Sequence, residues 1–200
     1  LDRNNMPYPI GRKVSVTCGQ YIVHTDDDYS FVSNMAAGYA GMVSTLPLDQ
    51  SSTCQVINIP TPMYELTNYQ LGLLTQSGFV TVKKSYSKGW VITDGITMAP
   101  VDSAYRRLST AKVINVVDRE LRRVIEPFIG LQDNLATLNS LNTAITSVLN
   151  KLKENLISYY DFKIVTDQAS ARLGIIKIQY VIIPTNEIKE VRNTVSVQES

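Results

Sequence analysis

The chain has few of the residues on which most enzymes and metal sites depend. Its 200 residues include one histidine, two cysteines and one tryptophan. His24 is therefore the only histidine that could serve a catalytic triad, and no serine or cysteine stands in a nucleophile-elbow sequence. Cys18 and Cys54 lack the CxxC spacing of zinc and redox motifs, so we expect two reduced thiols in a cytosolic product. The sequence predicts neither hydrolase chemistry nor a disulfide scaffold.

Charge of either sign is also scarce. Charged residues make up 18% of the chain, and 19 basic residues nearly balance 18 acidic ones. The net charge of +1 creates no long-range field that would gather nucleic acid or anionic lipid. No run approaches the roughly 20 apolar residues that a membrane-spanning helix needs, and the N-terminus has no signal-peptide pattern. We expect no nucleic-acid partner and no membrane insertion.

Motifs for metals, nucleotides and acid–base catalysis are equally sparse. Residues 26–28, three aspartates close to His24, form the only metal-like cluster, but the ligands of a Ca²⁺ loop spread over about 12 residues and end in a glutamate. A solvated turn is the favoured interpretation. The glycines are too scattered for a phosphate-binding loop, and Asp118 and Glu120 would point to different faces of a helix. We therefore predict no enzymatic activity, no cofactor and no metal.

The first hundred residues combine short strand patterns with short helix patterns. β-Branched and aromatic residues between turn signals predict strands, and small or apolar residues at helical spacing predict helices. Thr67 before the second helix and Gly78 after it are typical cap residues. The predicted strands are 13–18, 21–25, 79–83 and 89–93, with a further candidate at 55–59, and the predicted helices are 30–44 and 67–77.

The second half of the chain begins with two amphipathic helices and ends in strands. Apolar residues from Val113 to Ile125 recur at steps of three and four, and Pro127 ends this helix. A second apolar stripe predicts a helix over 135–157, which should pack against the first. After residue 158 the apolar residues alternate, which indicates strands. The fold class is therefore predicted as α+β, with a mixed sheet flanked by helices.

Several stretches, in order along the chain, resemble the conserved C-terminal region of contractile-tail sheath proteins of the phage type. The first is a small-residue helix that ends in a proline-bearing loop, and the second is a helix, a glycine and an apolar strand. A tryptophan strand, a helix with paired arginines and a short Glu-Pro-Phe segment follow. These stretches are residues 35–47, 71–82, 90–95, 105–121 and 126–128.

The resemblance implies a structural subunit of the virion tail that is assembled in the bacterial host cytoplasm. It would polymerise helically with copies of itself around an inner tail tube, and on release at the baseplate it would contract and drive the tube through the host envelope. The helix over 136–157 would face the tube, with Lys151, Lys153 and Glu154 as candidate contacts. The expected division is 1–29 as an N-terminal segment with strands, 30–185 as the core domain and 186–200 as a C-terminal arm.

The arm would add a strand to the sheet of a neighbouring subunit. A run from Ile188 to Val197 spans about 33 Å when extended, at roughly 3.3 Å per residue, and a long unpaired strand promotes self-association. The residues expected to link subunits are Ile188, Val191, Val195 and Val197.

One alternative has the same composition: a non-enzymatic binding or interaction domain of a virion, in which the last strand pairs within its own sheet. The chain begins with Leu1 and not with methionine, which indicates a fragment or processed piece of a longer protein.

Overall fold

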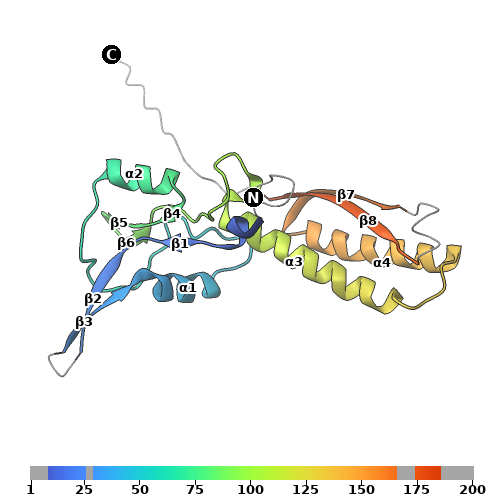
Figure 1. Ribbon diagram of the computed structural model, residues 1–200, viewed down its shortest axis with the longest axis horizontal. Helices are drawn as coiled ribbons and strands as arrows, with labels where there is room; N and C mark the ends of the chain where they lie inside the picture. Colours follow the sequence, from blue (N-terminus) through green and yellow to red (C-terminus); the bar gives the residue numbers. More distant parts are fainter. Residues whose placement is uncertain (1–8, 26–28, 166–173, 186–200) are drawn as a thin grey trace, which may run out of the picture.

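The computed structural model describes residues 9–25, 29–165 and 174–185. These residues form an elongated molecule, and helix α3 (Leu108–Ile125) runs from its middle along one half (Figure 1). The other half is built from the residues that precede α3. The α+β class expected from the sequence is confirmed.

Strand pairs and two short helices build the first half. Met35 and Tyr39 of its first long helix are buried against residues of the last strands, such as Val80 and Ile92, and form one hydrophobic core. The elements in chain order are η1 (Pro9–Lys13), β1 (Val16–Thr17), β2 (Gln20–His24), β3 (Ser30–Asn34), α1 (Met35–Thr45), α2 (Asn68–Gln76), β4 (Phe79–Val80), β5 (Val82–Ser85), β6 (Gly89–Ile92) and η2 (Ala104–Arg106).

The helix predicted over 30–44 is wrong in its first five residues. Ser30–Asn34 is strand β3, which pairs antiparallel with β2, and α1 starts only at Met35. The Asn34 side chain accepts a hydrogen bond from the backbone N–H of Ala36 at 3.0 Å and so caps the helix. Phe31 and Val32 favour a strand, and the cross-strand pairing with β2 outweighs the helical spacing of the small residues that follow.

Two further strand predictions need correction. The candidate strand over 55–59 is reduced to one bridge between Val56 and Val91, directly after Cys54, which has a positive φ of 59°. The strand predicted over 79–83 divides into two: β4 pairs in parallel with β1, and β5 forms the expected hairpin with β6. Helix α2 matches its prediction, and Thr67 and Gln70 form a capping box at its start.

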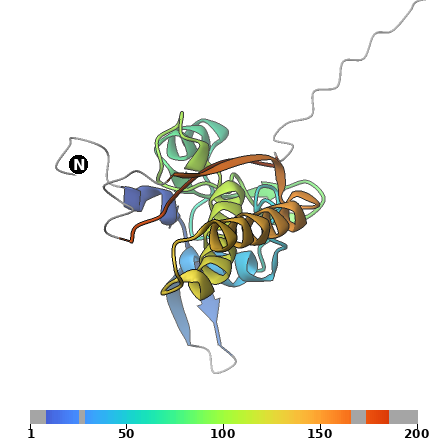
Figure 2. The same cartoon turned by 90° about the vertical axis from the view of Figure 1, so that its right-hand side faces the viewer.

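The second half packs α3 and α4 (Leu135–Lys153) against a two-stranded ribbon of β7 (Ile157–Val165) and β8 (Lys177–Pro184). The two helices pack together as expected, β7 lies on α4, and β8 contacts α3 (Figures 1 and 2). The apolar stripes of both helices meet in one hydrophobic core. Its buried residues are Val113, Val117, Leu121, Leu141, Ile145, Leu149 and Ile157.

The helix predicted over 135–157 ends four residues early, at Lys153. Glu154 is its C-cap, and Leu156 still donates its backbone N–H to the carbonyl of Leu152 at 2.8 Å. Ile157 continues the apolar stripe in sequence, but it is buried in the same core as the first residue of β7. Period alone cannot separate a last helical turn from the first buried residue of a strand.

The strands do not merge into one mixed sheet. Within the described residues they form four two-stranded ladders, of which β1–β4 is parallel and β2–β3, β5–β6 and β7–β8 are antiparallel. The ladder of β2 and β3 spans the expected boundary at residue 29. The division into three regions stays a prediction, because residues 186–200 lie outside the described part of the chain.

Candidate assembly surfaces

The β7–β8 ribbon has one face on the helices and one face in solvent. Tyr160, Phe162 and their neighbours on the inner face pack against the core of α3 and α4. On the outer face Tyr159, Val181 and Ile183 are 51%, 62% and 48% exposed. Tyr159 stands opposite Ile183 in the ladder, so these three side chains form a continuous apolar patch. In a sheet with one face in solvent, that face normally carries polar residues, which alternate along each strand with the apolar residues of the buried face.

Both outer edges of the ribbon are unpaired within the described residues. Each strand therefore presents a row of backbone N–H and C=O groups that can bind a further strand. Proline and dense charge are the usual protection against such pairing. Proline occurs in the ribbon only at Pro184, the last residue of β8. The ribbon has the geometry of a platform for strand addition.

Side-chain hydrogen bonds fix the ribbon to the helices. The Tyr160 hydroxyl donates to the Asn150 side chain of α4 at 2.5 Å, and the Tyr180 hydroxyl donates to the Asp118 carboxylate of α3. Burial, together with the hydrogen bond to Asp118, raises the pKa of Tyr180 to about 12. The phenol stays protonated in the folded protein and continues to donate. The platform is thus held at both helices.

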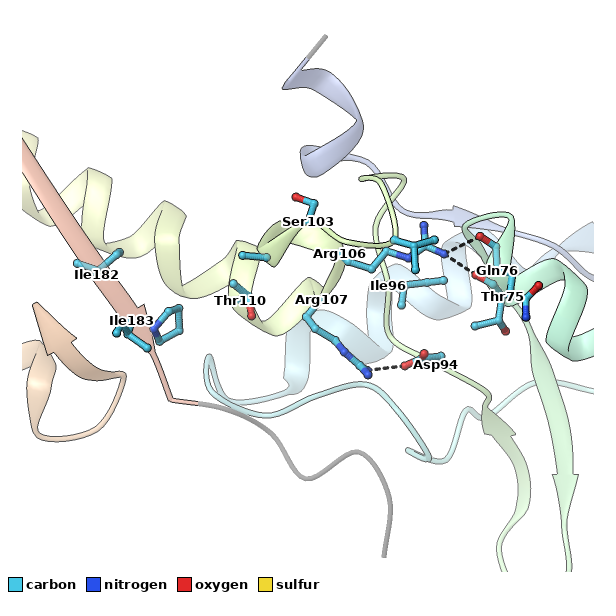
Figure 3. A pocket seen from close by; sticks show the side chains of 13 residues that line it. Thr75, Gln76, Asp94, Ile96, Ser103, Arg106, Arg107, Thr110, Ile182 and Ile183 are labelled. Atoms are coloured by element: carbon cyan, nitrogen blue, oxygen red, sulfur yellow. Dashed lines mark hydrogen bonds and ion pairs between the residues drawn. The ribbon is translucent and has the colours of Figure 1, made fainter. Parts of the chain in front are cut away.

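Arg106 fixes the end of α2. Its guanidinium donates to the backbone carbonyl oxygens of Thr75 and Gln76 at 2.5 and 3.1 Å (Figure 3). It also donates to the carbonyl oxygen of Ala99 at 2.8 Å. The last carbonyls of a helix have no partner within the helix, and a cation at this end also favours the helix dipole. Arg106 therefore ties α2 to the start of α3.

Arg107 makes a partly buried ion pair with Asp94 at 2.7 Å. The same carboxylate accepts a hydrogen bond from the Thr53 hydroxyl at 3.0 Å, and the Thr53 oxygen accepts one from the backbone N–H of Gly95 at 2.9 Å. A Cβ on Gly95 would lie 2.2 Å from the Ser52 Oγ, so only glycine fits there. The paired arginines thus have a structural role within the subunit.

A cavity of about 560 Å³ lies beside these arginines, and Ile182, Ile183 and Pro184 of the ribbon close its other side (Figure 3). The polar groups of Arg106, Arg107 and Asp94 in this cavity already bind one another or the backbone. Among the described residues no three histidine, cysteine, aspartate or glutamate side chains gather at a possible metal site. In the same part of the chain no helix is long and apolar enough to cross a bilayer.

The predicted tube contacts lie together at the end of α4. Lys151 and Lys153 are in its last turn and Glu154 follows, and all three are exposed. The Lys153 ammonium lies 5.9 Å from the centre of the Tyr160 ring. The exposed side of α4 before Lys151 is uncharged, with Asn139, Asn142, Thr143, Ser147 and Asn150. The role of these residues stays a prediction.

The predicted linking residues Ile188, Val191, Val195 and Val197 lie outside the described residues. Among the described residues the sequence leaves β8 at Pro184, and Thr185 donates its backbone N–H to Leu156 at 3.1 Å. His24 lies at the outer end of β2, where its ring hydrogen-bonds to Ser30 at 2.8 Å. Residues 26–28 are also outside the described part.

Comparison with solved structures identifies the fold. The contracted helical sheath of the anti-feeding prophage matches with a TM-score of 0.80 at 15% identity, over 98% of this chain and 59% of that chain. The sheath of a contracted extracellular injection system, PVC, matches with a TM-score of 0.75 at 14% identity, over 93% and 57%.

This chain has the fold of contractile-sheath proteins. A sheath tail protein from Listeria innocua also matches, with a TM-score of 0.70 at 12% identity, over 92% of this chain and 45% of that one. No protein-family model and no curated protein matches the sequence. The chain spans about half the length of these sheath proteins, and the expectation of a sheath-like fold is confirmed.

Proposed function

We propose that this protein is a structural, non-enzymatic subunit of a contractile sheath. It polymerises with copies of itself around an inner tube, attaches to a baseplate and contracts to drive the tube through the envelope of a target cell. The observation that carries the proposal is the β7–β8 ribbon: a two-stranded sheet fixed to both helices, whose two edges are unpaired within the described residues, in a chain with the sheath fold.

Subunits are linked by strand addition. The C-terminal arm, residues 186–200, follows β8 in the sequence and would pair with the ribbon of the next subunit, where Ile188, Val191, Val195 and Val197 would supply apolar contacts. Backbone hydrogen bonds provide the affinity, and alternate side chains on the ribbon face provide the register. The exposed patch of Tyr159, Val181 and Ile183 supports this role, because an added strand would extend the sheet beside it.

Contraction needs links that persist while the bodies move. An arm that is paired through its backbone keeps the same hydrogen-bond register with the neighbouring subunit, and the subunit body rotates about this link as a unit. The net driving force is the burial of more surface between bodies in the contracted arrangement, at about 25 cal/mol for each Å² of apolar area. This mechanism uses no cofactor, and the subunit would act in a phage tail or a related injection system, assembled in the bacterial cytoplasm.

The tube-facing element is α4. Lys151, Lys153 and Glu154 are candidate contacts at its end. The rest of its exposed side carries uncharged amide and hydroxyl side chains, so this surface would make few electrostatic contacts with the tube. The proposal for the tube therefore rests on the exposure and composition of one helix.

The experiment compares the full chain with a variant that lacks residues 187–200, by negative-stain electron microscopy and circular dichroism. We expect uniform polymers from the full chain and folded, unpolymerised protein from the truncated one. A matched pair of variants refines the test: Val195→Asp with Val197→Asp should block polymers, whereas Ser196→Asp with Gln198→Asp, on the opposite side of an extended strand, should not. Polymers from the truncated protein would refute strand addition. A full chain that stays monomeric would favour the virion binding domain.

A further inference from the structure

A small basic hollow lies between η1 and α3. Its volume is about 190 Å³, and Arg12, Lys13 and Arg122 bring three positive charges to it. Among the described residues, Asp118 is the only acidic one that lines it. Three cations and one carboxylate leave two positive charges in excess, and a hollow lined mainly by one sign of charge concentrates the electric field within it. The hollow therefore favours an anionic ligand.

The three cations are not neutralised within the subunit. None of them has an ion-pair partner among the described residues. The Arg12 guanidinium lies over the Tyr105 ring, 4.8 Å from its centre, and a cation–π contact uses no acceptor lone pair, so its N–H groups remain able to donate. The Asp118 carboxylate, in contrast, already accepts a hydrogen bond from the Tyr180 hydroxyl. Positive charge is thus available in the hollow, whereas its carboxylate has a partner.

The fold brings the basic groups together before any ligand binds. A Cβ on Gly11 would lie 2.9 Å from the Met98 carbonyl oxygen, so the backbone of η1 passes close to that segment just before Arg12. Met98 also donates its backbone N–H to the Val14 carbonyl at 2.9 Å, directly after η1. Arg122 stands on the regular helix α3. A site with its backbone already in place pays less ordering entropy on binding.

We propose that this hollow binds a phosphate group, with Arg12 and Arg122 as its main ligands and Lys13 as the third cation. A phosphate group carries about −1.5 to −2 charge at neutral pH, which matches the two positive charges in excess, whereas a carboxylate would balance only half of them. The planar guanidinium fork suits phosphate oxygens, to which it can donate two parallel hydrogen bonds. A single water needs roughly 10–15 Å³ of such space, so a phosphate group has room.

A bound phosphate would join elements that are distant in the sequence. Arg12 and Lys13 end η1, and Arg122 lies in the last turn of α3. Tyr180 of β8 reaches the same place through its hydrogen bond to Asp118. The ligand would therefore stabilise the packing of η1 on α3 beside the ribbon. This effect belongs to the single subunit, so it is independent of the proposed polymerisation and can be tested without it.

The experiment is thermal unfolding of the full chain, followed by circular dichroism, with inorganic phosphate exchanged for chloride at constant ionic strength. At ten times its dissociation constant, a ligand of the folded state raises the unfolding temperature of a chain of this length by about 3–6 °C. We expect a rise that saturates. Phosphate also stabilises folded proteins by its exclusion from their surface, but that effect does not saturate in the same way and acts on every variant.

Paired variants separate binding from net charge. Arg12→Gln with Arg122→Gln should weaken phosphate binding at least roughly tenfold, because two charge-assisted donors are lost. Arg119→Gln with Arg123→Gln removes the same charge from the exposed side of α3, outside the hollow, and should leave binding unchanged. Asp118→Asn removes the opposing carboxylate and should strengthen binding about two- to fivefold. Each variant is compared with itself in chloride, so a change in its basal stability does not affect the result.

Acetate and phosphoserine define the class of ligand. Acetate should bind more weakly than phosphate. Phosphoserine that binds as tightly as phosphate would identify a phosphate monoester as a ligand, and much weaker binding would leave free phosphate; both results support a phosphate site. The absence of a saturable rise in wild type, an equal rise in the Arg12→Gln, Arg122→Gln variant, or acetate binding as tight as that of phosphate would each overturn the proposal. Protein that binds phosphate but never polymerises would contradict the proposed function alone.

Discussion

Replacement of Arg106 by alanine should loosen the end of α2 from the segment that leads into α3. The side chain makes three hydrogen bonds to backbone carbonyls, at 2.5, 2.8 and 3.1 Å. A hydrogen bond to a charged group contributes about 1.5–3 kcal/mol when it is buried. One of the three bonds is exposed and the others are only partly buried, so we expect a loss of about 2–4 kcal/mol in the free energy of unfolding.

The Arg106→Lys variant separates the effect of the positive charge from the effect of the forked hydrogen-bond geometry of the guanidinium. A single ammonium keeps the cation at the end of α2 but cannot reproduce the fork that spans two elements. We expect Arg106→Lys to lose about 1–2 kcal/mol, between wild type and alanine. Arg119→Ala, at an exposed position on α3, is the control and should stay within about 0.5 kcal/mol of wild type.

The assay is urea unfolding, in which a change of midpoint at constant slope reports a change of stability. Hydrogen exchange of the α2 amides adds local information, because loss of the Arg106 bonds should release the helix C-terminus first. If the free energy of unfolding of Arg106→Ala lies within about 0.5 kcal/mol of the wild-type value, the bonds to Thr75, Gln76 and Ala99 do not hold α2 in place, which would contradict this prediction.

Three further predictions follow from packing and ionisation. Ile145→Ala, in the core beneath the ribbon, should cost about 2–5 kcal/mol in a denaturant titration, and Ser147→Ala on the exposed side of α4 should change little. Gly95→Ala should destabilise by about 1–3 kcal/mol because its Cβ meets Ser52, whereas Gly72→Ala, in open space on α2, should stabilise by about 0.5–1 kcal/mol; equal effects would contradict the close approach. The raised pKa of Tyr180 means that the folded state holds its proton more tightly than the unfolded state, so this stabilisation is complete below pH 10 and is lost as the pH rises towards about 12. An absorbance titration should therefore lose a component near pH 12 in Tyr180→Phe, and an unchanged curve would argue against the hydrogen bond to Asp118.

The sequence was sufficient to predict an element where its apolar residues follow a single helical or strand period. The helices α3 and α4 were predictable because a single apolar stripe faces a single core, and the capping box of α2 is a local signal. Phe31 and Val32 favour a strand, but the small residues after Asn34 favour a helix over the same region. The pairing with β2, which makes residues 30–34 a strand, is a tertiary contact that the local sequence does not show. Ile157 fits both a helical stripe and a strand.

The candidate surfaces were less accessible from the sequence. The alternation after residue 158 indicated strands, but it could not show that, among the described residues, the two strands pair only with each other. The paired arginines resembled a family motif, while their partners, Asp94 and three backbone carbonyls, come from distant segments.

The most direct test of strand addition is a cryo-electron microscopy structure of the assembled full chain at a resolution that separates strands. We predict that the β7–β8 ribbon lies inside a larger sheet, with at least one edge paired to residues 186–200 of a neighbouring subunit. An assembly in which both edges of the ribbon remain unpaired, or are covered only by the subunit's own chain, would contradict the account.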